Sequence, residues 1–177
     1  MTIEAGSSHS TELIDQKGID SLKKALTTEP FPYNPLEVAM YLNLKVYQSF
    51  LKKIPNSNGL LGFFRRENNV SYIYIEETLP ISQKREVVAR GIFRHFLSPQ
   101  KNNLLSDIYQ HADNTPIPTP EEYLCDTFAK DFLMPQEEFI KIYNRFQGVK
   151  NPFTSIAQHF NVEEYYAQER IKDLNLE

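Results

Sequence analysis

The sequence contains little of what marks secreted, membrane-spanning or nucleic-acid-binding proteins. A single cysteine, Cys125, excludes an intrachain disulfide framework and favours a reducing compartment. No apolar run approaches the roughly 20 residues of a transmembrane helix, and residues 1–10 lack the basic-then-apolar order of a secretion signal. A formal net charge of −4 provides no positive excess for nucleic acid or anionic lipid. We therefore expect a cytoplasmic protein with neither a membrane nor a nucleic acid as its direct partner.

The remaining composition is that of an ordinary globular domain. Hydrophobic residues make up 41% and charged residues 24% of a chain of 177 residues, which is long enough for one core. We expect residues 1–10 to form a flexible tail, residues 11–147 to form the main domain, and residues 148–177 to form a helix-turn-helix-like C-terminal extension. The sequence contains no internal repeat and no low-complexity segment.

Hydrophobic periodicity predicts an α+β fold with a helical C-terminal part. Short aromatic or β-branched runs at Val46, 59–65 and 70–75 predict a three-stranded, mainly antiparallel sheet, whose last two strands form a hairpin. Helices are predicted, in chain order, over 11–27, 36–42, 85–97, 120–134, 137–146, 154–160 and 163–174. The polar, proline-bearing stretch 98–118 is predicted to be a long loop.

Three residues are predicted to cap these helices. Asn34 and Thr119 each precede a proline, which suits the first helical position, and Glu122 completes a capping box with Thr119. Ser82 is the predicted N-cap of the helix that follows Pro80.

Two helical segments carry the most specific pattern in the chain. The first reads Arg85-Glu-Val-Val-Ala-Arg-Gly-Ile-Phe-Arg-His-Phe96, and the second reads Glu121-Glu-Tyr-Leu-Cys-Asp-Thr-Phe-Ala-Lys-Asp-Phe-Leu-Met-Pro135. Their order, and the closing Phe-Leu-Met-Pro, resemble the ImmA/IrrE family of metallopeptidases. The resemblance runs from about Asn34 to the C-terminus and implies a small zincin-like domain, in which the sheet packs on the first of these helices.

The same resemblance indicates that the metal site has been lost. In that family the first helix carries His-Glu-x-x-His, in which two imidazoles at i and i+4 bind zinc and the glutamate is the general base. Aligned on Ala89, these positions are Arg90, Gly91 and Arg94. A guanidinium has no free lone pair for a metal, and glycine has no group to accept a proton. The family's third ligand is a glutamate early in the second helix, of which Glu121 or Glu122 is the predicted remnant.

The resemblance, combined with this loss, implies a catalytically inactive pseudopeptidase that needs no cofactor. Active members of the family act on helix-turn-helix repressors, so the implied partner is another protein, either such a repressor or a regulatory complex. The arginines have two interpretations. They form salt bridges to Glu121 or Glu122, which we favour, or they bind a carboxylate or phosphate in the former substrate cleft.

An alternative function is a metal-dependent peptidase with relocated ligands. The candidate ligands are His95, His111, Asp113 and Glu122. Scattered histidines are more often solvent-facing or capping residues, so this interpretation is the weaker one.

Tyr72 and Tyr74 alternate with isoleucines in a predicted strand, and we expect them to line an exposed strand edge beside the cleft, where a partner peptide binds. Cys125 lies in the apolar stripe of its helix and is predicted to be a core thiol rather than a nucleophile. The last helix has more acidic than basic residues, which disfavours DNA reading and favours packing or protein contact.

Overall fold

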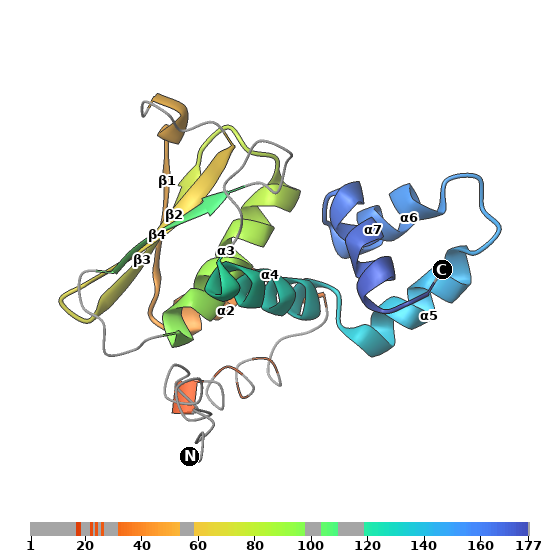
Figure 1. Cartoon of the computed structure of the whole chain (residues 1–177), viewed down its shortest axis with the longest axis horizontal. Helices are drawn as coiled ribbons and strands as arrows, with labels where there is room; N and C mark the ends of the chain where they lie inside the picture. The colour runs from red at the N-terminus through yellow and green to blue at the C-terminus, as the bar shows by residue number, and fades with distance from the viewer. Residues whose placement is uncertain are drawn as a thin grey trace, which may run out of the picture.

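The computed structural model describes residues 17–18, 22, 24, 26, 32–53, 59–97, 104–109 and 119–176. The predicted tail over residues 1–10 lies outside the described residues. Of the predicted helix over 11–27, the five described residues are helical. Figure 1 shows a sheet with three helices against it and, beyond them, a group of three C-terminal helices.

The elements alternate between helix and strand before the chain becomes wholly helical. The strands are β1 (Lys45–Ser49), β2 (Leu60–Glu67), β3 (Val70–Glu76) and β4 (Leu104–Tyr109). The helices described in full are α2 (Pro35–Tyr41), α3 (Ile81–Phe96), α4 (Pro120–Leu133), α5 (Gln136–Phe146), α6 (Pro152–Phe160) and α7 (Glu164–Asp173), and a short 3-10 helix, η1, spans Leu51–Lys53. The predicted α+β class with a helical C-terminal part is confirmed.

The sheet has four strands in the order β1-β3-β2-β4. Strand β2 runs antiparallel to both β3 and β4, whereas β1 runs parallel to β3. The prediction of a long loop over 98–118 is therefore wrong for its middle, because Leu104–Tyr109 forms the edge strand β4. This run is short, and its own sequence pattern only weakly favours a strand. It forms a strand because it pairs with β2, so tertiary structure decides its conformation.

The predicted hairpin between β2 and β3 is confirmed and turns at two asparagines. Asn68 and Asn69 have φ values of 49° and 63°, as a two-residue turn with both central residues left-handed requires. Such a turn matches the right-handed twist of the flanking strands. The local sequence therefore defines the register of the central strand pair.

Helix α3 packs closely on one face of the sheet because two glycines leave room for it. A Cβ on Gly62 would lie 2.4 Å from the carbonyl oxygen of Tyr74 and 2.7 Å from Cγ1 of Val87. A Cβ on Gly91, in the middle of α3, would lie 2.6 Å from Cδ1 of Ile73. The central strands therefore bury Phe64, Ile73 and Ile75 in the same core as Val87, Val88 and Ile92 of α3.

The predicted caps hold for two of the three helices. Asn34 Oδ1 accepts the Leu36 amide at 3.1 Å, and Thr119 forms the capping box with Glu122. Ser82 does not cap α3. That helix begins at Ile81, with Pro80 at the cap position, because the Lys84 amide already donates to the Pro80 carbonyl at 3.0 Å. The Ser82 hydroxyl instead donates to Glu163, just before α7.

The C-terminal helices are anchored to the rest of the domain through α7. Tyr166 is fully buried, its neighbour Tyr165 donates to Glu86 Oε2 of α3 at 2.7 Å, and Lys130 of α4 bonds Asp173 at 3.1 Å. The boundary expected near residue 148 stays a prediction. Within the described part of the chain, no helix has the length and apolar character needed to cross a bilayer.

Candidate functional site

The face of α3 that the resemblance assigns to zinc carries a buried ion pair. Arg90 Nη1 lies 3.4 Å from Glu86 Oε1, one turn earlier, and their side chains are only 4% and 3% exposed. Burial opposes the charge on Arg90, but the carboxylates of Glu86 and Asp126 outweigh it, so the pKa of Arg90 is raised. Arg90 is therefore a permanent cation in the interior. It pairs with Glu86 rather than with the predicted Glu121 or Glu122.

Arg94, one turn further along α3, joins this helix to the start of α4. Its Nη1 atom lies 3.2 Å from Glu121 Oε2, and the exposed fractions of the two side chains are 11% and 44%. This is the cross-helix salt bridge that the sequence predicts for one of the arginines. Glu122 has a different role, because its carboxylate accepts the Thr119 amide at 2.6 Å in the capping box.

Gly91 occupies the position that the resemblance assigns to the general base, and the space beside it is filled. Cδ1, Cγ1 and Cγ2 of Ile73 all lie within 3.2 Å of where a Cβ would stand. A glutamate there would have to displace the central strand of the sheet or its core side chain. The packing therefore leaves no room for a carboxylate at this position.

The residues at this face do not fit a zinc ion. Two guanidinium groups replace the imidazoles, and a metal cannot coordinate nitrogen that has no available lone pair. Among the described residues, no three His, Cys, Asp or Glu side chains come together as a metal-binding group. The donor set that a zinc peptidase needs is therefore missing from this face of α3.

The relocated-ligand alternative has one described histidine, His95, which is held by hydrogen bonds at the end of α3. His95 Nδ1 lies 2.9 Å from Ser71 Oγ and 3.4 Å from Arg66 Nη2. Its backbone carbonyl accepts a bond from Arg66. This arrangement ties the end of α3 to the hairpin, away from the Arg94–Glu121 pair. His111 and Asp113 lie outside the described residues, so their part in such a site stays a prediction.

Tyr72 and Tyr74 do not lie on a free edge, because β3 is central and pairs with β1 on one side and β2 on the other. Their rings instead stack with those of neighbouring strands. Tyr74 lies 4.5 Å from Phe63 and 5.6 Å from Tyr47, measured between ring centroids. The prediction of a peptide-binding edge at these tyrosines is therefore wrong, since hydrogen bonds to two neighbours occupy that strand.

Cys125 is a buried thiol, as predicted. It packs with Phe93, Leu97 and Phe128, and burial raises its pKa to about 11 although Arg94 and Arg90 act to lower it. A thiol with so high a pKa is almost entirely protonated at neutral pH and is a poor nucleophile.

A charge network centred on Lys130, between α4 and α7, was not predicted from the sequence. Lys130 Nζ of α4 lies 3.1 Å from each of three carboxylates, on Asp126 of α4 and on Glu169 and Asp173 of α7. Burial opposes its charge, and the carboxylates of Asp126 and Glu169 outweigh it, so its pKa is raised. A local signal was present: Glu86 precedes Arg90, and Asp126 precedes Lys130, by four residues in each case.

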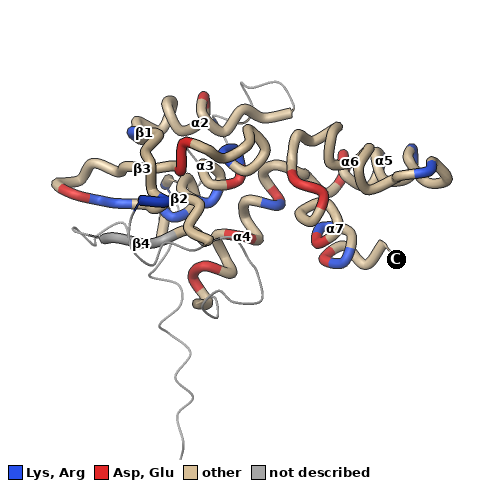
Figure 2. Tube along the Cα trace, turned by 90° about the horizontal axis from the view of Figure 1, so that it is seen from above, with Lys and Arg blue, Asp and Glu red and all other residues tan. Residues whose placement is uncertain are grey.

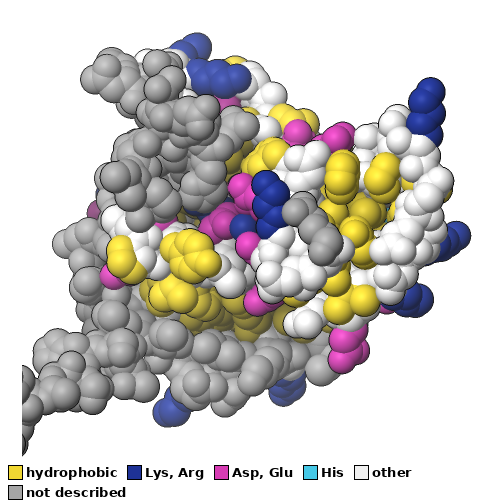
Figure 3. Space-filling model, turned by 45° about the vertical axis from the view of Figure 1, so that its right-hand side comes forward, with side chains coloured by type: hydrophobic (Ala, Val, Ile, Leu, Met, Phe, Trp, Pro, Cys, Tyr) yellow, Lys and Arg dark blue, Asp and Glu magenta, His cyan; other side chains and the backbone are white. Residues whose placement is uncertain are grey.

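The C-terminal helices carry charges of both signs rather than a basic surface. Figure 2 shows acidic and basic positions interleaved along α7. Arg170 is buried, pairs with Asp131 at 2.7 Å and bonds the Met134 carbonyl. Figure 3 shows acidic and basic side chains adjoining near the centre of one face, beside grouped hydrophobic side chains. This pattern does not resemble a phosphate-binding surface.

Comparison of the sequence with known families gives a match to a peptidase family. The profile described as the IrrE N-terminal-like domain, a peptidase family, matches residues 47–172, which span the sheet, α3, α4 and most of the C-terminal helices. Comparison with curated proteins gave no match.

Proposed function

Because this chain belongs to the IrrE N-terminal-like family of peptidases, we propose that it is a non-catalytic member that binds another protein. The observation that carries the proposal is the replacement of the metal-binding face of α3 by Arg90–Glu86 and Arg94–Glu121. These pairs supply the positive charge that a metal would otherwise bring to the carboxylates between α3 and α4.

Two further features support the loss of hydrolysis. Ile73 fills the space beside Gly91, where the general base would stand. The positions that match the imidazoles carry guanidinium groups, which neither bind zinc nor accept a proton at neutral pH. A hydrolytic centre needs both an activated water and a proton acceptor, and this face of α3 provides neither.

The proposed partner is a protein rather than a nucleic acid. The chain is acidic overall, and two basic side chains near α7, Arg170 and Lys130, are buried in ion pairs. By resemblance to the ImmA/IrrE family, the partner class is a helix-turn-helix repressor or a regulatory complex that contains one. A non-cleaving relative would sequester such a protein.

The proposal is tested by the metal content of protein purified without chelator, together with a zinc titration of its melting temperature. We expect well below one equivalent of metal and no zinc-dependent rise. As a control, the same preparation is assayed for cleavage of a candidate repressor with and without added zinc. Near one equivalent of zinc, with a higher melting temperature and cleavage, would replace this proposal by the relocated-ligand peptidase.

A further inference from the structure

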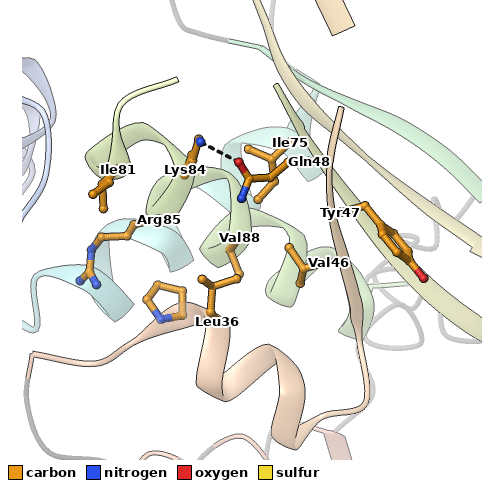
Figure 4. Close-up of a pocket in the computed structure, with 10 residues that line it drawn as sticks. Leu36, Val46, Tyr47, Gln48, Ile75, Ile81, Lys84, Arg85 and Val88 are labelled. Atoms are coloured by element: carbon orange, nitrogen blue, oxygen red, sulfur yellow. Dashed lines mark hydrogen bonds between the residues drawn. The ribbon is translucent and has the colours of Figure 1, made fainter. Parts of the chain in front are cut away.

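A second site lies on the far end of α3 from the Arg94–Glu121 pair. A pocket of about 510 Å³ opens between α2, β1 and the first half of α3. Val46 and Val88 point into it and Leu36 lies at its mouth, whereas Tyr47 points to the other side of β1 (Figure 4). Pockets of this size with mainly apolar walls are typical ligand sites.

Two cations at this pocket lack an acidic partner within the described part of the chain. Lys84 Nζ donates to the amide oxygen of Gln48 at 2.7 Å (Figure 4). Arg85 Nη2 donates to the Tyr33 carbonyl at 3.1 Å. The Nε atom of Arg85 is buried, and no described residue accepts its hydrogen bond. No acidic residue is among the described residues that line the pocket. A carboxylate from a ligand would supply a counter-charge to Lys84, which otherwise bonds only a neutral amide oxygen.

The pocket borders a strand edge that can pair with another chain. Strand β1 bonds β3 on one side, and no strand of the described part pairs with its other side. Lys45 begins this strand, and Lys52 and Lys53 follow it closely. An unpaired edge offers backbone donors and acceptors to an extended peptide, and the surrounding lysines favour an acidic one.

Exposed apolar side chains extend the pocket beyond the size of a small ligand. Met40 is 71% exposed, Ile81 is 70% exposed, and Leu36 and Tyr41 are each about half exposed. These side chains belong to α2 and to the start of α3, the helices that form two of the pocket's walls. An adjoining apolar surface and a free strand edge together suit a peptide better than a compact small molecule.

We propose that an extended, acidic and apolar peptide segment of a partner protein pairs with the free edge of β1, places an apolar side chain in the pocket and binds Lys84 through a carboxylate. This proposal rests on the protein-binding function proposed above and names the surface at which the partner protein would bind. It is separate from the face of α3 that carries Arg94.

The test uses the full chain and a phage library of random peptides of about eight residues, enough to span the five residues of β1. We expect enriched peptides in which apolar residues alternate with Asp or Glu. For the best synthetic peptide, measured by fluorescence anisotropy, Ile81→Asp and Lys84→Glu should each weaken binding by about tenfold or more. Ile81 is exposed and Lys84 is partly buried, and neither belongs to the hydrophobic core, so neither change threatens it.

The matched control is Lys150→Glu, the same charge change at an exposed position between α5 and α6. It should leave the affinity unchanged. The proposal is overturned if no peptide is enriched, if the enriched peptides are basic, or if the pocket variants bind as well as Lys150→Glu. It is also overturned if decanoate, a small apolar carboxylate, binds more tightly than the peptide and displaces it.

These outcomes are distinct from those that test the proposed function. A stoichiometric, stabilising zinc ion would end the non-catalytic interpretation and leave the measured peptide affinity standing. Loss of the peptide site, with no zinc bound, would leave a non-catalytic protein whose partner binds at another surface.

Discussion

Arg90 and Arg94 lie one helical turn apart, and both side chains are largely buried, but their partners differ in exposure. Glu86, the partner of Arg90, is almost completely buried, whereas Glu121, the partner of Arg94, is nearly half exposed. Removing Arg90 leaves a carboxylate unpaired in the interior, whereas removing Arg94 leaves one that water reaches. The two arginines are therefore expected to differ in their effect on stability.

Arg90→Ala should lower the free energy of unfolding by about 3–5 kcal/mol, because Glu86 and Asp126 would lose a buried cation. Arg94→Ala should cost only about 1 kcal/mol. Urea denaturation of both variants measures the difference. The control is Arg65→Ala, whose salt bridge with Glu67 is about half exposed. Equal losses for Arg90→Ala and Arg65→Ala would contradict the role given to the buried pair.

Gly91→Ala should destabilise the protein by about 1–3 kcal/mol through overpacking against Ile73. Elsewhere in a helix the same change stabilises, since alanine has the better helix propensity. Thermal denaturation of Gly91→Ala, Ile73→Ala and the double variant forms the test. The loss caused by Gly91→Ala should shrink or change sign when Ile73 is already truncated, and an unchanged loss would rule out this contact as the cause.

At the level of elements, the end of β3 is fastened to η1 by one carboxylate. Glu76 accepts the Lys52 amide at 2.9 Å, and the Thr78 amide and hydroxyl at 3.0 and 2.8 Å. Burial acts to raise the pKa of Glu76, but these hydrogen bonds lower it from 4.5 to about 2. The unfolded chain therefore takes up a proton at a higher pH than the folded chain does.

It follows that Glu76 stabilises the fold fully above pH 4.5, and that this contribution is lost as the pH falls toward 2. Glu76→Gln should cost about 1–3 kcal/mol at pH 7 and clearly less at pH 3. Urea titrations at both pH values measure it. Glu67→Gln, at a partly exposed position, is the control and should show no such difference. A loss that is independent of pH would mean that the charge of Glu76 is irrelevant.

The elements also show which features the sequence could predict. The caps at Asn34 and Thr119 and the turn at Asn68 depend on neighbours within a few residues, and these predictions hold. The strand β4 and the central place of β3 depend on pairing between distant segments, which no local pattern encodes.

The same distinction applies to the candidate site. The substitutions at Arg90, Gly91 and Arg94 are read directly from the sequence, but their partners are not. Both arginines were expected to pair with Glu121 or Glu122, whereas Arg90 pairs with Glu86 of its own helix and Arg94 pairs with Glu121. The peptide-binding edge was expected at Tyr72, yet β3 is central and the edge strands are β1 and β4, because the parallel pairing places β1 outside β3.

For the whole molecule, the charge network joins the C-terminal helices to the sheet-bearing part. Lys130→Ala should lower the free energy of unfolding by about 3 kcal/mol or more, because three carboxylates would lose their shared cation. We expect α6 and α7 to lose their hydrogen-exchange protection first, since Lys130 joins α4 to α7. The surface variant Lys141→Ala should change neither. Uniform loss of protection in all helices would contradict this ordering.

The order of strands in the sheet also predicts the order in which the strands pair during folding. The β2–β3 hairpin closes over a two-residue turn, whereas β1 joins only through β3, with all of β2 lying between them in the chain. Local pairs close quickly and distant pairs close slowly, so β1 is expected to dock after the hairpin and to detach before it. The β1 wall of the pocket is then less persistent than the central hairpin. A peptide that pairs with β1 would therefore slow the detachment of this strand from the sheet.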